Sequence, residues 1–163
     1  EVAGDAGSIW ASFHVAGGFG MGPIEKTSRD ELERLHRMNA ATCFLCCREA
    51  VKAMRTSKGG GRIVNVSARP AVEPVPGLLA YQMSKSAVAS LTQGLAKEAK
   101  GDGILVNAVL PSLMDTPANR EAMPDADHEK WPKCPDVARM MAWLGSKENV
   151  LTWGALVPVY GEA

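Results

Sequence analysis

The sequence predicts an α/β protein in which helices cover both faces of a parallel sheet. Strand-like segments at residues 8–16, 62–67, 104–110 and 155–160 are apolar along their length and alternate with helical segments. Continuous apolar strands are typical of parallel sheets that are buried on both faces. We expect residues 1–163 to form a single domain, because this length and a hydrophobic content of 46% suffice for one core.

The first half of the chain reads as a strand, a glycine loop and two helical segments. Residues 8–16 (SIWASFHVA) lead into the glycine loop GGFGMGP, where a buried strand would end. Thr27 and Ser28 are candidate N-caps for a helix with acidic residues in its first turn. This helix is either interrupted or simply continued at Asn39. Residues 40–55 are apolar around most of the circumference, as in a helix packed between a sheet and a second surface.

The second half alternates strand and helix in the same way. The strand at 62–67 follows the turn SKGGGR, and the helix at 78–100 has two apolar faces and a narrow polar stripe. Two buried faces indicate a sheet on one side and a partner subunit on the other. We therefore expect a homodimer or homotetramer formed through the 40–55 and 78–100 helices. Residues 123–133 are expected to form a mobile lid, and Pro135 to begin the last helix.

The charge balance favours a small molecule as the ligand. The chain has 18 basic and 18 acidic residues and a formal net charge of zero, without a long block of like charge. Nucleic acids and anionic membrane surfaces are therefore not the expected partners. No apolar run approaches the roughly 18 residues that span a bilayer, and the first residues do not resemble a secretion signal. We expect a cytoplasmic location.

The cysteines and histidines do not have the spacing of a metal site. Cys43 and Cys46 form a C-x-x-C with no second pair beside it. Cys43 and Cys47 fall on one helical face, which indicates buried reduced thiols. The other residues of these two types are isolated in the sequence: Cys134, His14, His36 and His128. We therefore expect no bound metal, and we expect His14 to pack near the carboxyl end of the sheet.

Tyr81 and Lys85 stand at the start of the helix at 78–100, after a strand and a loop rich in Pro and Gly. A Lys four residues after a Tyr lies one helical turn along, so its ammonium can approach the phenol. An ammonium in that place would lower the pKa of the phenol toward the working pH of a general acid or base. The pair Y-x-x-x-K is common by chance, and its position before a helix that is poor in charge favours the functional interpretation.

Six segments resemble the short-chain dehydrogenase/reductase family, in the family's order and over nearly the whole chain. They are HVAGG (14–18), Asn39, GRIVNVSA (61–68), YQMSK (81–85), ILVNAVLPSLMDTP (104–117) and GALVPVYG (154–161). The resemblance implies a truncated Rossmann-like fold that corresponds to the C-terminal two thirds of a family member. The loop VAGGFG and the stretch 114–127 look most similar to the branch that includes dihydropteridine reductase.

This resemblance implies NAD(P)H-dependent reduction of a carbonyl or imine substrate, with a pterin-like ring as one candidate. Tyr81 would protonate the substrate as hydride arrives from the reduced form of NAD or NADP. Lys85 would lower the pKa of the phenol and hold the nicotinamide ribose, and Asn39 would anchor a water that relays protons to Lys85. The remaining cofactor contacts would come from Gly17, Pro111 and Thr116.

Two features depart from the family pattern. Most members have a Ser thirteen residues before the Tyr, and here that position is Ala68, as in the dihydropteridine reductase branch. Ser67 is expected to face the opposite side of the strand. The T-G-x-x-x-G-x-G turn, whose amides bind the pyrophosphate, is absent, and the glycine loop after residue 16 does not open a helix. We expect the coding sequence upstream of Glu1 to supply that turn.

Two other functions stay open at this point. The chain could be a remnant that binds no dinucleotide and acts as a dimeric binding or structural protein. Alternatively, its cleft could support a non-redox reaction such as hydrolysis, although no G-x-S-x-G elbow is present. Trp131 and Met123 could line a pocket for a flat ring or could anchor the lid, and the sequence does not distinguish these two roles.

Overall fold

A computed structural model describes residues 8–162 and contains a four-stranded parallel sheet. The strands lie side by side in chain order: β1 (Ala11–His14), β2 (Gly61–Val66), β3 (Ile104–Pro111) and β4 (Leu156–Val159). All four carboxyl ends therefore meet at one edge of the sheet. Strand β1 is shorter than the predicted segment 8–16, because only these four residues pair with β2.

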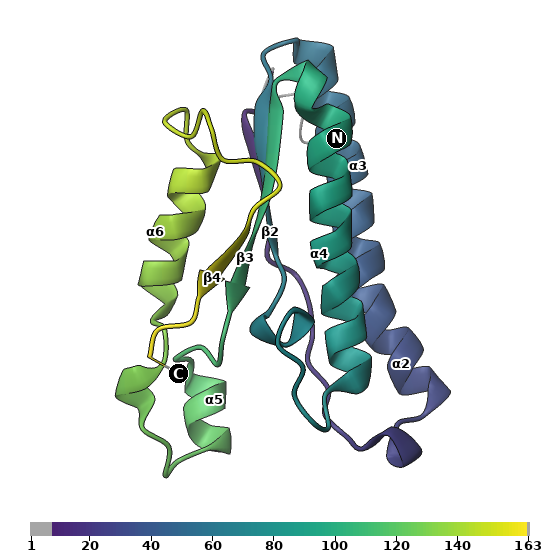
Figure 1. The fold of residues 1–163 in the computed structure, drawn as a ribbon, viewed down its shortest axis with the longest axis vertical. Helices are drawn as coiled ribbons and strands as arrows, with labels where there is room; N and C mark the ends of the chain where they lie inside the picture. The colour runs from purple at the N-terminus through teal and green to yellow at the C-terminus, as the bar shows by residue number, and fades with distance from the viewer. Residues whose placement is uncertain (1–7, 163) are drawn as a thin grey trace.

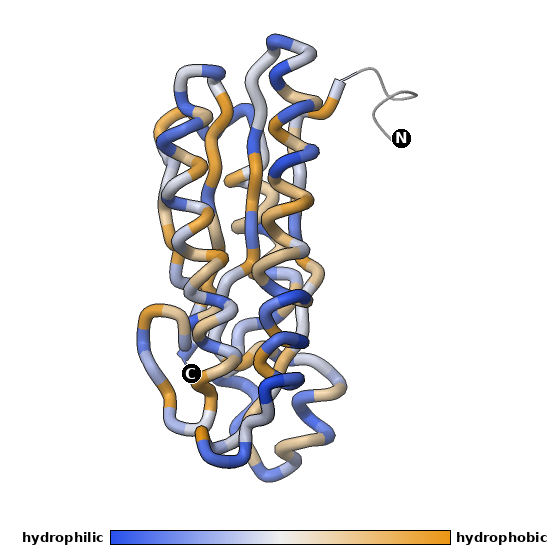
Figure 2. Tube along the Cα trace, turned by 90° about the vertical axis from the view of Figure 1, so that its right-hand side faces the viewer, coloured by the Kyte–Doolittle hydropathy of each residue, from blue (hydrophilic) through white to orange (hydrophobic). Residues whose placement is uncertain are grey.

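Helices cover both faces of this sheet, as the sequence predicts. The helices are α2 (Arg29–His36), α3 (Thr42–Ser57), α4 (Leu79–Ala99), α5 (Pro117–Ala122) and α6 (Cys134–Gly145). Short turns lie at η1 (Ile24–Lys26), η2 (Arg37–Ala41), η3 (Arg69–Ala71), η4 (Lys100–Asp102) and η5 (His128–Lys130). Figure 1 shows α3 and α4 on one face and α6 on the other. Figure 2 shows α3 and α4 standing side by side in front of the sheet. The α/β, Rossmann-like fold class is confirmed.

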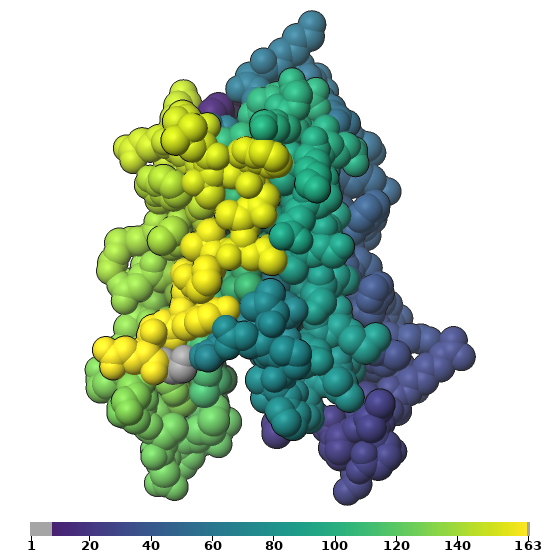
Figure 3. All heavy atoms as spheres, viewed as in Figure 1, coloured from purple at the N-terminus to yellow at the C-terminus, as the bar shows by residue number. Residues whose placement is uncertain are grey.

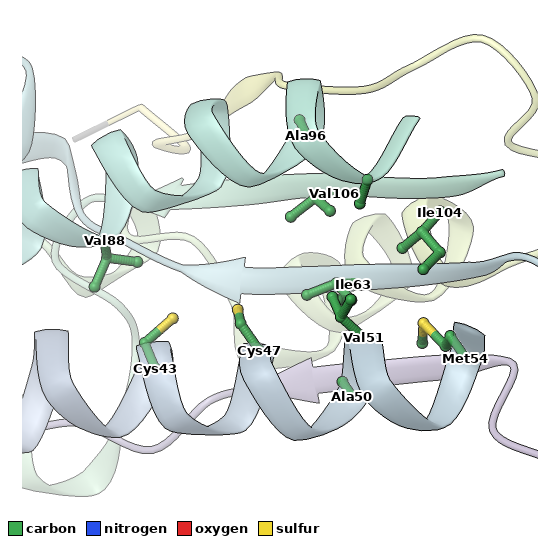
Figure 4. Packing of buried hydrophobic residues seen from close by; sticks show 11 residues of the cluster. Cys43, Cys47, Ala50, Val51, Met54, Ile63, Val88, Ala96, Ile104 and Val106 are labelled. Carbon is green, nitrogen blue, oxygen red and sulfur yellow. The ribbon is translucent and has the colours of Figure 1, made fainter. Parts of the chain in front are cut away.

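Two apolar clusters form the core, one on each face of the sheet. Met54 of α3, Val88 of α4 and Ile63 of β2 belong to the larger cluster and are almost completely buried (Figure 4). The second cluster joins Val64 and Val109 of the sheet to α6. Successive residues 63 and 64 therefore face opposite clusters, which is the reason that the strands are apolar without alternation.

The polypeptide between α2 and α3 does not break but forms one π-helical turn. Ser28 caps α2, since its Oγ accepts a hydrogen bond from Glu31 N at 3.1 Å. Residues Arg37–Ala41 then form the π turn η2, which contains Asn39. Such turns are rare and often occur at functional sites. The sequence left open whether the helix is interrupted at Asn39, and the structure shows a continuous helical path with a changed hydrogen-bond pattern.

The predicted lid segment contains more structure than expected. Residues His128–Lys130 form the turn η5, and Trp131 is only 5% exposed. The ring of Trp131 lies 4.6 Å from that of His128, and Glu162 N donates to Lys130 O at 2.9 Å. Trp131 therefore anchors this segment, whereas Met123 is 36% exposed. Among residues 8–162, no helix combines the length and apolar character that a membrane crossing requires.

Candidate active site

Lys85 is the most unusual charged residue at the carboxyl edge of the sheet. It lies in the second turn of α4 and is 6% exposed. Its ammonium donates a hydrogen bond to the carbonyl oxygen of Val66, at the end of β2, at 2.9 Å. Burial lowers the pKa of Lys85 to about 8. The residue is therefore charged at neutral pH but close to losing its proton.

Asn39 holds the glycine loop beside this ammonium. The side chain of Asn39 is buried, and its Oδ1 accepts from Gly18 N at 2.9 Å while its Nδ2 donates to Gly18 O at 3.0 Å. A Cβ atom on Gly17 would lie 2.6 Å from Asn39 Oδ1 and 3.3 Å from the Lys85 ammonium. The loop can approach Asn39 and Lys85 this closely because residue 17 has no side chain.

Tyr81 lies one turn before Lys85 on α4 and is connected to Asn39 through Ser84. Asn39 Nδ2 donates to Ser84 Oγ at 2.9 Å, and Ser84 Oγ donates to the Tyr81 carbonyl oxygen at 2.7 Å. The Tyr81 ring meets Phe19 edge-on, with a centroid separation of 5.0 Å. The structure thus brings four of the predicted residues into one group: Gly17, Asn39, Tyr81 and Lys85.

The electrostatics of Tyr81 differ from the prediction. Burial raises the pKa of Tyr81 to about 12, and no interaction with Lys85 offsets this effect. Within residues 8–162, the Tyr81 hydroxyl has no hydrogen bond, and the Lys85 ammonium is directed to Val66. The predicted lowering of the phenol pKa by Lys85 is therefore wrong for this arrangement. The reason is that burial disfavours the phenolate while the ammonium binds a backbone carbonyl.

Pro111 and Thr116 lie at the same edge but on another segment. Pro111 ends β3, and Thr116 caps α5 by accepting from Asn119 N at 3.2 Å. No hydrogen bond between the described residues joins Thr116 to α4. Figure 3 shows the surface hollowed between residues 114–130, in green, and residues 69–80, in teal. Thr116 belongs to the first of these segments, and Lys85 lies on α4, which begins within the second.

Neither residue at the end of β2 supplies the second hydroxyl donor found in most of the family. Ala68 is buried and has no polar side chain. Ser67 is 2% exposed, and its hydroxyl donates to the Lys85 carbonyl oxygen at 2.8 Å. Ser67 thus fixes the backbone of α4 instead of facing the hollow.

Sequence reasoning missed the linking role of Ser84 and the carbonyl of Val66 as the partner of Lys85. Ser84 forms the connection between Asn39 and Tyr81, and Val66 accepts from Lys85. A serine in a helix has no recognisable motif, and a backbone carbonyl has no sequence signal. For Ser84, the only available hint was its place within YQMSK, between the two predicted catalytic residues.

The donors of this group suit the ribose hydroxyls of a dinucleotide. An ammonium has three N–H donors, and among the described residues only Val66 accepts from Lys85. Two donors on a nearly buried cation are thus available to ligand oxygens such as ribose hydroxyls. The sequence lacks the glycine-rich turn that would bind the pyrophosphate.

Sequence comparison places these features in a known family. The short chain dehydrogenase family matches residues 1–127. A short-chain type dehydrogenase/reductase of Picea abies is 35% identical over 147 residues, which cover 85% of this chain and 54% of that protein. The uncharacterized oxidoreductase YohF of Escherichia coli is 30% identical over 163 residues, with 95% and 64% covered. The chain thus spans about half to two thirds of the length of these relatives.

Solved structures show the same fold. Acetoin dehydrogenase from Enterobacter cloacae superposes with a TM-score of 0.89 at 28% identity, covering 98% of this chain and 66% of its own. The structure of ElxO with NADP bound superposes with a TM-score of 0.92 and covers 98% of this chain and 69% of its own. Because its sequence identity is 23%, this comparison supports the fold and nothing beyond it. These comparisons do not single out the dihydropteridine reductase branch. The chain belongs to the short-chain dehydrogenase/reductase family.

Proposed function

We propose that the chain carries the proton-donating and nicotinamide-binding end of an NAD(P)H-dependent reductase that acts on a carbonyl or imine. The observation that supports this proposal is the Lys85 ammonium, which is nearly buried beside Gly17 and retains two unpaired donors. Nicotinamide ribose hydroxyls are suitable acceptors for these donors. Pro111 and Thr116 would contact the cofactor from the other side of the hollow.

Tyr81 would act as the general acid. NADH or NADPH, when bound, supplies the hydride. Because the pKa of Tyr81 is raised to about 12, the phenol keeps its proton at neutral pH. It can donate this proton to the substrate oxygen or nitrogen on which negative charge develops as the hydride is transferred. With a pKa of about 8, Lys85 is mostly charged at pH 7, so its ammonium would hold the ribose hydroxyls and place the nicotinamide near Tyr81.

Asn39 would act mainly as a positioning residue. Both Nδ2 hydrogens and one lone pair of Oδ1 are used by Gly18 and Ser84. The water relay to Lys85 would therefore use the second lone pair of Oδ1. In this role Asn39 sets the separation between the glycine loop and the turn of α4 that carries Tyr81.

The missing hydroxyl at Ala68 bears on the substrate. Ser67 does not replace it, because its hydroxyl donates to the Lys85 carbonyl oxygen. A substrate that depends on a second donor to its reacting oxygen is thus less suitable than a ring imine that Tyr81 alone protonates. We propose a pterin-like ring as this substrate, to be compared with simple ketones and aldehydes in one activity panel.

The test combines cofactor binding with the Tyr81→Phe variant. Calorimetric titration of the chain with NADH and with NADPH is expected to show saturable binding. Lys85→Met should weaken the affinity for the nucleotide at least tenfold. Tyr81→Phe should retain this binding and lose at least about 100-fold in turnover, which is in the range of general acid catalysis. Retained turnover in Tyr81→Phe would remove Tyr81 from its role.

The alternative function is a binding or structural protein without a dinucleotide. The observation that favours this alternative is that no hydrogen bond joins the Lys85 ammonium to the Tyr81 hydroxyl among residues 8–162. The same titration separates the reductase from this alternative, because a flat calorimetric trace with both nucleotides would leave only functions that need no dinucleotide.

Self-association through α3 and α4 is also proposed. Phe44 and Leu45 on α3 and Met83 on α4 are 53%, 47% and 59% exposed, which is unusual for large apolar side chains. Sedimentation equilibrium is expected to show a dimer or tetramer, and Phe44→Ser with Met83→Ser should shift it toward monomer. A monomeric wild-type chain at tens of micromolar would contradict this proposal.

A further inference from the structure

Strand β1 and helix α3 bring together three potential metal ligands that are distant in the sequence. Cys43 and Cys47 lie one turn apart on α3, and Figure 4 shows both thiols directed from this helix toward the sheet. His14 is the last residue of β1. One ring nitrogen of His14 and the two sulfur atoms all lie within 4.8 Å of one another.

These separations approach those of a tetrahedral zinc shell. Zinc–sulfur bonds of about 2.3 Å and zinc–nitrogen bonds of about 2.0 Å imply roughly 3.6 Å between sulfur and nitrogen and roughly 3.8 Å between two sulfurs. Cys47 Sγ lies 3.4 Å from His14 Nδ1. The upper limit of 4.8 Å exceeds the sulfur–sulfur value by about 1 Å, which changes in side-chain torsion can provide.

Asn65 offers a fourth ligand that is already oriented toward the other three. Its Oδ1 lies 2.8 Å from His14 Nδ1 and accepts from Cys47 Sγ at 3.5 Å. The amide nitrogen of Asn65 donates to Thr92 Oγ1 at 2.9 Å, which turns the oxygen toward the thiols. Asn65 is completely buried. Its oxygen is therefore held in place by the fold.

Ser12 provides the outer contact that a metal-binding histidine requires. Ser12 Oγ lies 2.8 Å from His14 Nε2. When Nδ1 binds a metal, the proton resides on Nε2 and can be donated to this hydroxyl. Such a partner fixes the ring orientation and the tautomer of a ligating histidine.

We propose that His14, Cys43, Cys47 and Asn65 form a structural site for one thiophilic divalent ion of the zinc type. Two thiolates and one divalent cation carry no net charge together, so the loaded site would not bury an unpaired charge. Two sulfur ligands with an imidazole select zinc over magnesium or calcium. Protein atoms fill all four positions, so the ion would tie β1 to α3 and leave no open position for catalysis.

Zinc binding to the metal-stripped chain tests this site. Competition with a chromophoric chelator should give one Zn²⁺ per chain, and Co²⁺ should show a thiolate charge-transfer band. Cys47→Ser and His14→Gln should each weaken the affinity at least about 100-fold, and Ser12→Ala about tenfold. Cys46→Ser is the matched control, because this neighbouring thiol is exposed and does not belong to the cluster. The affinity of this variant should stay within twofold of wild type.

The proposal fails if the wild-type chain binds no stoichiometric Zn²⁺ or if the Co²⁺ complex lacks a thiolate band. It also fails if Cys46→Ser weakens binding as much as Cys47→Ser. If Cys47→Ser does not fold, the Ser12→Ala variant is the deciding test, because Ser12 lies outside the core. An unchanged Zn²⁺ affinity in Ser12→Ala would overturn the proposed site. Bound Zn²⁺ should also raise the melting temperature of the wild-type chain, because the ion binds only the folded state.

Discussion

Replacing the buried ammonium of Lys85 should make the stability of the chain less dependent on pH. Burial shifts the pKa of Lys85 from an ordinary value of 10.5 to about 8 in the folded chain. Between these two values the unfolded chain holds a proton that the folded chain has released. The stability of the wild-type chain therefore rises with pH in this window, and the penalty for burying the charge is complete below pH 8.

The magnitude follows from this window. At roughly 1.4 kcal/mol per pH unit, the interval from pH 8 to pH 9.5 corresponds to about 2 kcal/mol. Lys85→Met keeps the length of the side chain but cannot titrate. The free energy of unfolding of Lys85→Met minus that of the wild type should therefore fall by about 2 kcal/mol between pH 7 and pH 9.5.

Urea unfolding followed by tryptophan fluorescence at the two pH values measures this difference. Groups that titrate equally in both proteins cancel, so the change isolates Lys85. Lys97→Met is the matched control, because Lys97 is exposed on the same helix, and its difference from wild type should stay within about 0.5 kcal/mol. If the difference in the free energy of unfolding between Lys85→Met and the wild type also stays constant between pH 7 and pH 9.5, the ammonium is hydrated. That result would refute the reasoning from burial.

Two further predictions concern the loop and the phenol. Gly17→Ala places a methyl group 2.6 Å from Asn39 Oδ1 and should cost about 1–3 kcal/mol in urea unfolding. Gly94→Ala, in an open position of α4, is its control and should stabilise the chain by about 0.5–1 kcal/mol; equal effects of the two variants would contradict the close approach. Phe19→Ala exposes the ring of Tyr81 to water, so the pKa of Tyr81 should fall from about 12 toward 10 in an ultraviolet titration. An unchanged Tyr81 titration would show that Phe19 does not contribute to burying the phenol.

The fold class could be predicted because both faces of the sheet are buried. Ile63 and Val64 face opposite apolar clusters, and this two-sided burial leaves a continuous apolar run in the sequence. The ends of β1 could not be predicted from such a run. Ile9 packs against the core but does not pair with β2. An apolar residue at this end of the run is therefore buried without belonging to the strand.

The π turn at Asn39 had no sequence signal. Its side chain is held by Gly18 on one side and Ser84 on the other, and these contacts come from segments 21 and 45 residues away. A single π turn inserts about one residue relative to an α turn, and a shift that occurs only once does not form a recognisable period in the sequence. The hydrogen-bond pattern is therefore decided by long-range contacts, which a local pattern does not contain.

The parallel sheet, the helices on both faces and the one-turn spacing of Tyr81 and Lys85 could be read from the sequence, because periodicity and local spacing are properties of the chain. Tertiary structure decided that the Lys85 ammonium binds Val66, that burial raises the pKa of Tyr81, and that His14 meets the two thiols. These features depend on which atoms surround a group and how much water reaches it. The atoms around each group and its access to water are set only when segments distant in the sequence pack together.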